Sequence, residues 1–210
     1  MNKLIIASVL FLSLTAHAGD LTIGADVSAS NPMVASAEFA QVLASRLYKE
    51  VLKMEYGERI ELRTFGSTDI AHVKGKSMVI SRRTPPETAA ERVRNKIQSF
   101  AGKPADGSTN LLSFIENGRF HCDKPNSQLW LLTDGIEHSV DFDGNDLLAG
   151  KKLPKPFGKP LEGCEVVMIG VGRVSDGGRL PLTQIRTLKM AWSEWLSLAG
   201  ASSVRIEVDP

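Results

Sequence analysis

The chain has 210 residues, of which 42% are hydrophobic and 23% are charged. Its 25 Lys and Arg residues and 24 Asp and Glu residues leave a formal net charge of +1 at pH 7. This balance excludes an intrinsically disordered chain, which combines low hydrophobicity with high net charge. It also lacks the basic excess that usually marks a nucleic-acid-binding protein, so we expect no nucleic-acid partner. The length is typical of one domain or of two small ones.

The first 18 residues have the pattern of a secretory signal peptide. Lys3 gives the start a positive charge, residues 4–14 are largely apolar, and Ala16 and Ala18 are the small residues expected before a cleavage site. The apolar stretch is shorter than the roughly 20 residues that span a bilayer. We therefore expect cleavage after Ala18. The mature chain, residues 19–210, would be periplasmic or secreted without stable membrane insertion; an uncleaved N-terminal anchor is the alternative.

From residue 19 the sequence alternates between strand and helix patterns. A short apolar run at 21–25 ends at Asp26 and predicts a strand. Asn31 and Pro32 supply a helix cap and a first-turn proline, and apolar residues then recur at helical spacing over 33–56. The next predicted elements, in order, are strands at 60–65 and 77–81, a helix from Pro85-Pro86 to about 100, and a short helix at 109–117.

The second half continues the alternation. A nearly all-apolar run at 128–133 predicts a strand that is covered on both faces, and 164–171 predicts another of this type. Between them, residues 142–163 are rich in Gly, Pro and Lys, and we expect a surface insertion. A helix at 182–199 and an alternating edge strand at 204–208 complete the chain.

Strands that alternate with helices in this way predict an α/β fold. We expect one domain over residues 19–210 with a Rossmann-like, doubly wound and mostly parallel sheet and helices on both faces. Two cysteines, Cys122 and Cys164, are present. A disulfide between them, favoured by export, would close a loop of about 43 residues and stabilise the fold by about 4 kcal/mol. Free buried thiols are the alternative, and no Cys-x-x-Cys pair suggests zinc.

Polar side chains follow the ends of the predicted strands. Asp26, Ser28 and Ser30 come after the first strand, Thr109 lies in a Gly-Ser-Thr-Asn loop, and Asp134 follows the fourth strand. In doubly wound folds, ligands bind outside the carboxyl ends of the strands. Carboxylate and hydroxyl oxygens suit Mg²⁺ or Mn²⁺, with Ca²⁺ as a further candidate, better than Zn²⁺, which prefers nitrogen and sulfur. With so few carboxylates, a bound ion would keep much of its positive charge and attract an Asp or Glu from a partner.

These residues carry a family resemblance. Asp-x-Ser-x-Ser after the first strand, Thr in Gly-Ser-Thr-Asn and Asp in Thr-Asp-Gly resemble the metal-ion-dependent adhesion site (MIDAS) of the von Willebrand factor type A (vWA) domain. The order of elements is also similar over essentially all of the chain after the first 18 residues. The resemblance implies that Ser28, Ser30 and Thr109 are oxygen ligands, and that Asp26 and Asp134 bind the metal directly or through water. It also implies a protein-binding, adhesion or assembly role.

The same residues also allow a purely structural role or a catalytic one. Asp26, Ser28 and Ser30 could cap the helix near Pro32, with Asp134-Gly135 a simple turn. Ser28, His138 and Asp134 could be imagined as a nucleophile, a base and an orienting acid, but no Gly-x-Ser-x-Gly elbow surrounds any serine. We therefore expect a binding module and not an enzyme. The alternatives are a metal-free scaffold subunit of an envelope or secretion assembly, and a metal-assisted hydrolase.

Several polar residues away from these strand ends are typical of solvated loops. His72 and His121 are lone histidines in predicted loops, where solvent exposure is expected. Four polar residues near the start of the 142–163 region could hold a second ion such as Ca²⁺: Asp141, Asp143, Asn145 and Asp146. Their spacing differs from that of a helix-loop-helix calcium loop and favours a solvated acidic turn. Four lysines could form a basic partner surface or a solvated loop: Lys151, Lys152, Lys155 and Lys159.

Overall fold

A computed structural model describes residues 19–66, 75–103, 105–140, 142–175 and 177–210. The predicted signal peptide, His72 and Asp141 lie outside the described residues. No helix in these ranges is both long enough and apolar enough to cross a membrane.

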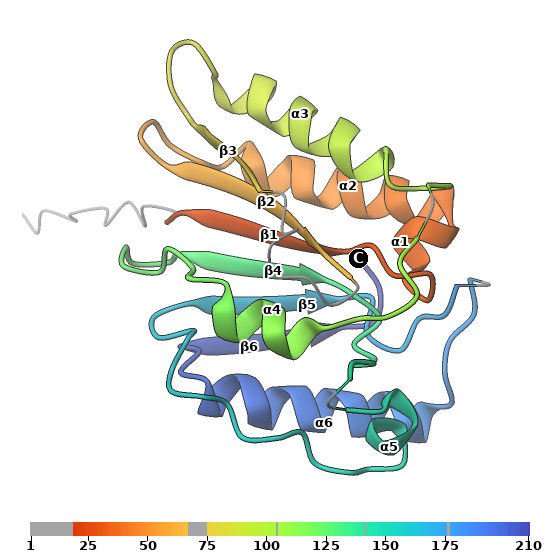
Figure 1. Ribbon diagram of the computed structural model, residues 1–210. Coiled ribbons are helices and arrows are strands. Elements are labelled where there is room, and N and C mark those ends of the chain that lie inside the picture. The colour runs from red at the N-terminus through yellow and green to blue at the C-terminus, as the bar shows by residue number, and fades with distance from the viewer. Residues whose placement is uncertain (1–18, 67–74, 104, 141, 176) are drawn as a thin grey trace, which may run out of the picture.

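A six-stranded sheet in the order β3-β2-β1-β4-β5-β6 forms the middle of the molecule (Figure 1). All neighbouring strands are parallel except β3, which runs antiparallel to β2 at one edge. The strands are β1 (Leu21–Asp26), β2 (Arg59–Phe65), β3 (Lys76–Val79), β4 (Gln128–Leu132), β5 (Glu165–Ile169) and β6 (Ser203–Glu207). The predicted α/β fold with a mostly parallel sheet is confirmed, and the last strand lies at an edge as its alternating residues indicate.

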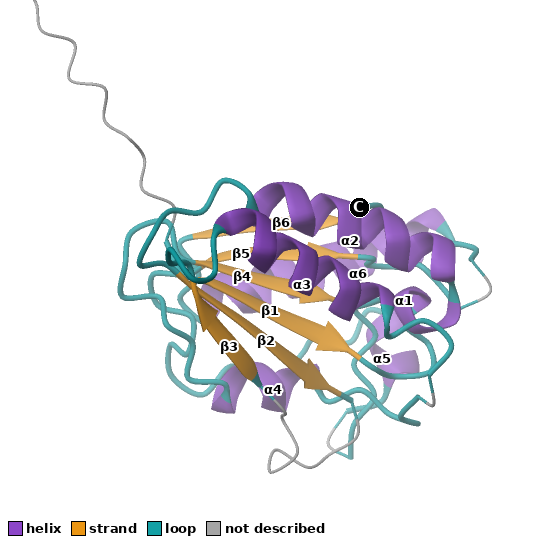
Figure 2. Cartoon of the chain, turned by 90° about the horizontal axis from the view of Figure 1, so that it is seen from above, coloured by secondary structure: helices purple, strands orange, loops and turns teal. Residues whose placement is uncertain are grey.

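Helices cover both faces of the sheet (Figure 2). They are α1 (Pro32–Ala35), α2 (Ala37–Val51), α3 (Pro86–Gln98), α4 (Leu111–Asn117), α5 (Gly144–Leu148) and α6 (Leu182–Leu198). Successive side chains of a strand point to opposite faces. Trp130 and Leu132 of β4 therefore pack in the core with α2 and α3, whereas Leu129 and Leu131 pack in a second core with α4 and α6. Two buried layers hold the sheet between them.

The helix predicted over 33–56 is two helices that end earlier. Ser36 has an extended backbone (φ −123°), ends α1 and begins α2, where its hydroxyl accepts a hydrogen bond from Phe39 N at 3.2 Å. Helix α2 ends at Val51, and Gly57 then turns the chain toward β2 with a φ of +95°. Because the apolar spacing continues across Ser36, periodicity alone predicts one helix.

The Gly-, Pro- and Lys-rich segment 142–163 contains a short helix and buried anchors. Leu147 of α5 and Leu161 are fully buried in the core beside α6. A Cβ on Gly144 would lie 2.6 Å from Ile136 Cγ2, so only glycine allows α5 to approach the loop after β4 this closely. Other residues in the loop parts of the segment, such as Lys151 and Phe157, are exposed.

The predicted disulfide is present between Cys122 and Cys164, whose Cα atoms are 5.0 Å apart. This Cα separation lies in the usual range for the bond. It joins the stretch between α4 and β4 to the residue immediately before β5. The bond therefore lies at the amino-terminal end of the parallel strands.

Candidate metal centre

The carboxyl ends of β1 and β4 bring two aspartates to one edge of the sheet. Asp26 is the last residue of β1, and Asp134 follows the end of the parallel neighbour β4 by two residues. Asn31 ties the two strand ends together, because its Nδ2 donates hydrogen bonds to Asp26 O and to Leu132 O, both at 2.8 Å. Both aspartate side chains are completely buried.

The loop after β1 curls around the Asp26 carboxylate. Asp26 Oδ1 accepts a hydrogen bond from Ser28 N at 2.9 Å, and Oδ2 accepts one from Thr133 Oγ1 at 2.8 Å. The hydroxyl oxygens of Ser28 and Ser30 lie 3.2 Å apart. The side chains at alternate positions 26, 28 and 30 therefore meet in one cluster.

Asp134 is only partly satisfied by its surroundings. Its Oδ1 accepts a hydrogen bond from Ile136 N at 2.8 Å, whereas Oδ2 is buried with no hydrogen-bond partner among the described residues. The Ser30 hydroxyl interacts with the Asp134 carboxyl and lowers its pKa, which opposes the effect of burial. It does not form a hydrogen bond of good geometry with Oδ2. Buried polar atoms in folded proteins nearly always have a partner, so an orphaned carboxylate oxygen is the kind of atom that a cation would satisfy.

The two carboxylates share an unfavourable electrostatic environment. Burial and, to a lesser extent, the negative charge of Asp134 raise the pKa of Asp26 to about 7, against the lowering effect of the hydrogen bonds from Ser28 and Thr133. Burial also raises the pKa of Asp134, to about 6. No described Lys, Arg or His side chain forms an ion pair with either group. Two neighbouring carboxylates out of water cannot both ionise easily without a cation.

Thr109 reaches the same edge through its main chain. Thr109 and His138 exchange two backbone hydrogen bonds of 3.0 Å, which place Thr109 beside the loop that follows Asp134. Three residues earlier, Asp106 O accepts a hydrogen bond from Ala29 N at 2.9 Å. The structure thus brings Asp26, Ser28, Ser30 and Asp134 into one network and holds the buried Thr109 in the adjoining loop.

Two further residues position this network, and sequence analysis assigned neither of them a role. Thr133 Oγ1 donates to Asp26 and accepts from Gly135 N at 3.1 Å, so it links the two aspartate loops. Glu137 is buried, and its Oε2 accepts hydrogen bonds from Leu111 N at 2.8 Å and Leu112 N at 3.2 Å. Burial raises the pKa of Glu137. Thr133 lies next to Asp134 in sequence, whereas the partners of Glu137 are 25 and 26 residues away and no local pattern points to them.

The rim of the centre carries exposed polar residues. His138 is exposed, and its Nδ1 lies 3.9 Å from Asp143 Oδ1. Asp143 itself caps α5 by accepting a hydrogen bond from Asn145 N at 2.8 Å. Within the described ranges, no three His, Cys, Asp or Glu side chains gather as a metal-binding group. Hydroxyl groups would therefore have to supply much of any coordination at this edge.

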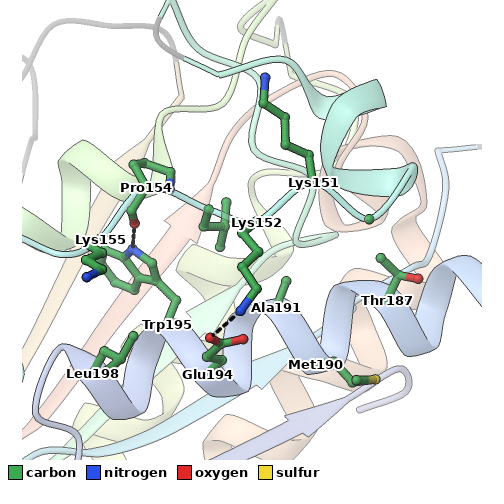
Figure 3. Close-up of a pocket in the computed structure, with 12 residues that line it drawn as sticks. Lys151, Lys152, Pro154, Lys155, Thr187, Met190, Ala191, Glu194, Trp195 and Leu198 are labelled. Atoms are coloured by element: carbon green, nitrogen blue, oxygen red, sulfur yellow. Dashed lines mark hydrogen bonds and ion pairs between the residues drawn. The ribbon is translucent and has the colours of Figure 1, made fainter.

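A separate groove of about 390 Å³ lies between residues 150–155 and α6 (Figure 3). Trp195 Nε1 donates a hydrogen bond of 2.7 Å to Pro154 O and fixes the segment to the helix. Lys152 pairs with Glu194 at 3.0 Å, and Lys151 pairs with Asp146 at 2.7 Å. Two of the four lysines considered as a basic partner surface are thus neutralised within the chain.

No protein-family model and no curated protein matches the chain in sequence. Among solved structures, it is similar to an aerotolerance-related membrane protein from Bacteroides fragilis, with 14% identity and a TM-score of 0.47 over 91% of this chain and 92% of the other. The conserved hypothetical protein BatB from Bacteroides thetaiotaomicron is 15% identical, with a TM-score of 0.45 over 91% and 90%. The pilus adhesin SpaC from Lactobacillus rhamnosus GG is 12% identical, with a TM-score of 0.43 over 93% of this chain and 28% of that one. Similarity of this degree assigns no role to the site residues. Any role has to be argued from the contacts that these residues make in this chain.

Proposed function

We propose that this edge of the sheet binds Mg²⁺ or Mn²⁺, and that the bound ion accepts a carboxylate from a protein partner. Ser28, Ser30 and Thr109 would contribute hydroxyl oxygens, and Asp26 and Asp134 would bind directly or through water. The observation that supports the proposal is the pair of buried carboxylates without a basic partner. When bound, the ion supplies a positive charge that the few surrounding carboxylates leave available to an outside acid.

The donor set fits such an ion. Hard divalent cations take oxygen ligands, and Mg²⁺ binds through one or two carboxylates while it keeps several waters. The unsatisfied Asp134 Oδ2 offers a lone pair that no described group uses. Ser30 is exposed whereas Ser28 is buried, so the cluster opens to solvent on the Ser30 side. A partner side chain would approach from there.

Calorimetric titration of the purified protein with Mn²⁺ tests metal binding. Ser30→Ala is the sharpest variant, because an exposed serine can be replaced with little risk to folding. We expect at least about tenfold weaker binding, since one ligand or one hydrogen bond to a charged group is lost. Thr109→Ala should weaken binding as well, and Asp134→Asn should abolish it. Ser45→Ala, an exposed serine of α2, is the matched control and should bind as the wild type does. Equal affinity in all variants would contradict the assignment.

Capture from envelope extract separates an adhesive role from a metal-free scaffold role. Immobilised protein should retain its partner in Mg²⁺ and release it in EDTA, and Ser30→Ala should retain less. Retention that survives the chelator would favour a scaffold subunit. The disulfide is consistent with export from the cytoplasm, and an envelope extract therefore samples the compartment where a partner would be found.

We also propose that the role is binding and not catalysis. The His138 side chain, which a nucleophile–base–acid arrangement would need as its base, is exposed and lies near Asp143, at the rim of the cluster. Turnover of small ester or phosphate substrates that disappears in Asp26→Ala would overturn this part of the proposal and favour a metal-assisted hydrolase.

A further inference from the structure

A cavity of about 1150 Å³ lies between α3 and the β2–β3 edge of the sheet, elements labelled in Figure 1. Leu62, Met78 and Val93 contribute apolar side chains to its wall, and Lys76, Lys96 and Lys103 contribute positive charge. We call this combination the basic hollow. Its volume slightly exceeds the roughly 300–1,000 Å³ of typical small-molecule binding sites, which are mostly apolar and carry a few placed polar groups.

Two of the lysines of the basic hollow lie over the ring of Phe100. Lys96 Nζ lies 4.5 Å from the centroid of Phe100, and Lys103 Nζ lies 5.9 Å from it. Burial lowers the pKa of Lys96, and the charges of Lys103 and Lys76 lower it further. Within the described ranges none of the three lysines is ion-paired with a carboxylate. Mutually repelling cations beside an apolar wall favour an anion that also carries hydrocarbon.

We propose that the basic hollow binds a long-chain fatty acid anion, with its carboxylate between Lys96 and Lys103 and its hydrocarbon chain along Leu62, Met78 and Val93. Charge complementarity selects an anion over a cation or a neutral amphiphile. The apolar wall selects a ligand with a hydrocarbon chain over a small inorganic anion, because only a chain gains free energy from burial there. At about 1150 Å³ the cavity has room for one such ligand.

Calorimetric titration with sodium dodecanoate below its micelle concentration tests the proposal. We expect saturable binding that weakens about tenfold in Lys96→Ala and in Lys103→Ala, since each removes a charged hydrogen-bond donor. Lys49→Ala, an exposed lysine of α2, is the matched control and should leave the affinity unchanged. Circular dichroism of each variant confirms that it is folded before it is compared.

The ligand series tests both parts of the site. Each methylene removed between dodecanoate and octanoate should weaken binding about fourfold. Dodecanol should bind more weakly than dodecanoate, and dodecyltrimethylammonium should not bind. The proposal would be overturned if both lysine variants bound dodecanoate as tightly as the wild type does. It would also be overturned if the wild type bound dodecanol as tightly as dodecanoate. A glutamate-rich peptide that binds with the same lysine dependence, while dodecanoate does not, would overturn it in favour of an acidic protein segment.

The basic hollow shares no proposed ligand with the metal site, although Val27, which stands between Asp26 and Ser28, also lines the cavity. Dodecanoate binding should be unchanged in Asp134→Asn and in EDTA, because neither alteration removes a residue of the hollow. Loss of fatty-acid binding in Asp134→Asn would contradict the separation of the two sites, whereas failure of Mn²⁺ binding in the wild type would leave the basic hollow untouched.

Discussion

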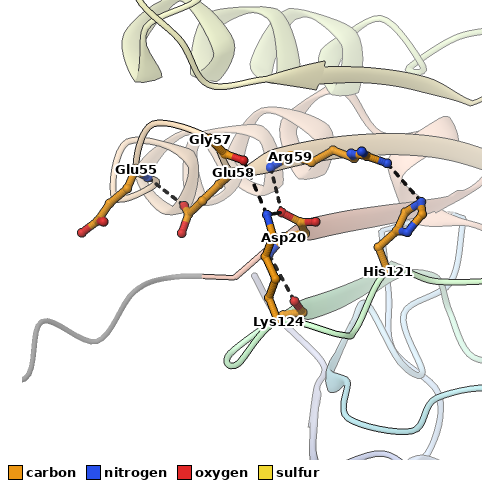
Figure 4. A network of polar contacts seen from close by, with 8 residues as sticks. Asp20, Glu55, Gly57, Glu58, Arg59, His121 and Lys124 are labelled. Carbon is orange, nitrogen blue, oxygen red and sulfur yellow. Dashed lines mark hydrogen bonds and ion pairs between the residues drawn. The ribbon is translucent and has the colours of Figure 1, made fainter.

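Two buried aspartates at opposite ends of β1 have opposite electrostatic surroundings. Asp20 immediately precedes the strand, and its Oδ1 accepts hydrogen bonds from Lys124 Nζ at 2.7 Å and Arg59 N at 2.9 Å (Figure 4). Asp26 ends the strand and meets only neutral donors and a second carboxylate, Asp134. The same residue type is thus charge-compensated at one end and uncompensated at the other.

The surroundings of the two ends extend this contrast. At the amino end, Lys124 Nζ also lies 3.5 Å from Gly57 O, and Arg59 Nη1 lies 3.2 Å from His121 Nε2. The disulfide fixes the stretch before β4. Every polar group named there meets a group of suitable charge or polarity. At the carboxyl end, the carboxylates of Asp26 and Asp134 have no basic partner among the described residues. Because strongly perturbed carboxylates concentrate at functional sites, the contrast supports the proposal that the carboxyl end binds a ligand, whereas the contacts of the amino end stabilise the fold.

Removing the disulfide is the strongest test of the amino end. In Cys122→Ala/Cys164→Ala, the unfolded chain regains the freedom of a long loop, and we expect a loss of about 4 kcal/mol in the free energy of unfolding. For a domain of this size, that corresponds to a Tm lower by about 10 °C. Mn²⁺ affinity, measured below the new Tm, should stay within about twofold of the wild type. A large loss of metal affinity in the folded variant would break the division between the two ends.

Neutralising an aspartate of the carboxyl end should remove metal binding and leave the stability of the metal-free protein unchanged or higher. With Mg²⁺ at about 100 times its Kd, the wild type should gain about 2.7 kcal/mol in the free energy of unfolding, or about 5–10 °C in Tm. Asp134→Asn should lose this gain. Its Tm in EDTA should equal or exceed that of the wild type, because the substitution removes a like-charge interaction from the buried pair. Thermal melts with and without Mg²⁺ measure both effects, and a Tm in EDTA that falls by several degrees would show that the carboxylate is structural.

The pH dependence of the metal-free protein sharpens the same point. Since burial raises the pKa of Asp26 to about 7, the stability that comes from its protonation is fully present below about pH 4 and is lost as pH rises through 7. Urea unfolding in EDTA should therefore show that Asp26→Asn gains stability over the wild type between pH 5 and pH 8, on the order of 2 kcal/mol. A difference between the two proteins that does not vary with pH would contradict the raised pKa.

The sequence alone predicted the features that local pattern and parallel topology control. Asp26 and Asp134 each follow an apolar run, and parallel strands carry such positions to one edge of a sheet, so their meeting follows from the order of the elements. The disulfide was likewise predictable, because the first 18 residues have a signal-peptide pattern that favours disulfides and two cysteines offer one intramolecular pair.

Features that depend on contacts between distant segments were not predictable. The hydrogen bonds that Leu111 N and Leu112 N donate to Glu137 join the start of α4 to the loop after β4, and no sequence spacing links these two segments. The break at Ser36 was missed because a local cap competes with helical periodicity that continues on both sides. The basic hollow draws its residues from β2, β3, α3 and the loop after α3, and none of these segments is unusual in composition.

The smallest expected effect concerns Asp20, the compensated counterpart of Asp26. Asp20→Asn keeps an acceptor for Arg59 N but removes the charge that faces Lys124, whose side chain is half exposed. We expect a loss of about 1 kcal/mol in the free energy of unfolding, since solvent screens the pair, and a Tm lower by about 2–4 °C. Mg²⁺ should still raise the Tm by as much as in the wild type. Because Asp20→Asn and Asp26→Asn make the same chemical change at the two ends of one strand, opposite signs of their effects in EDTA at pH 8 would establish the contrast directly. Equal signs would mean that burial alone, and not the neighbouring charge, sets the energetics of both aspartates.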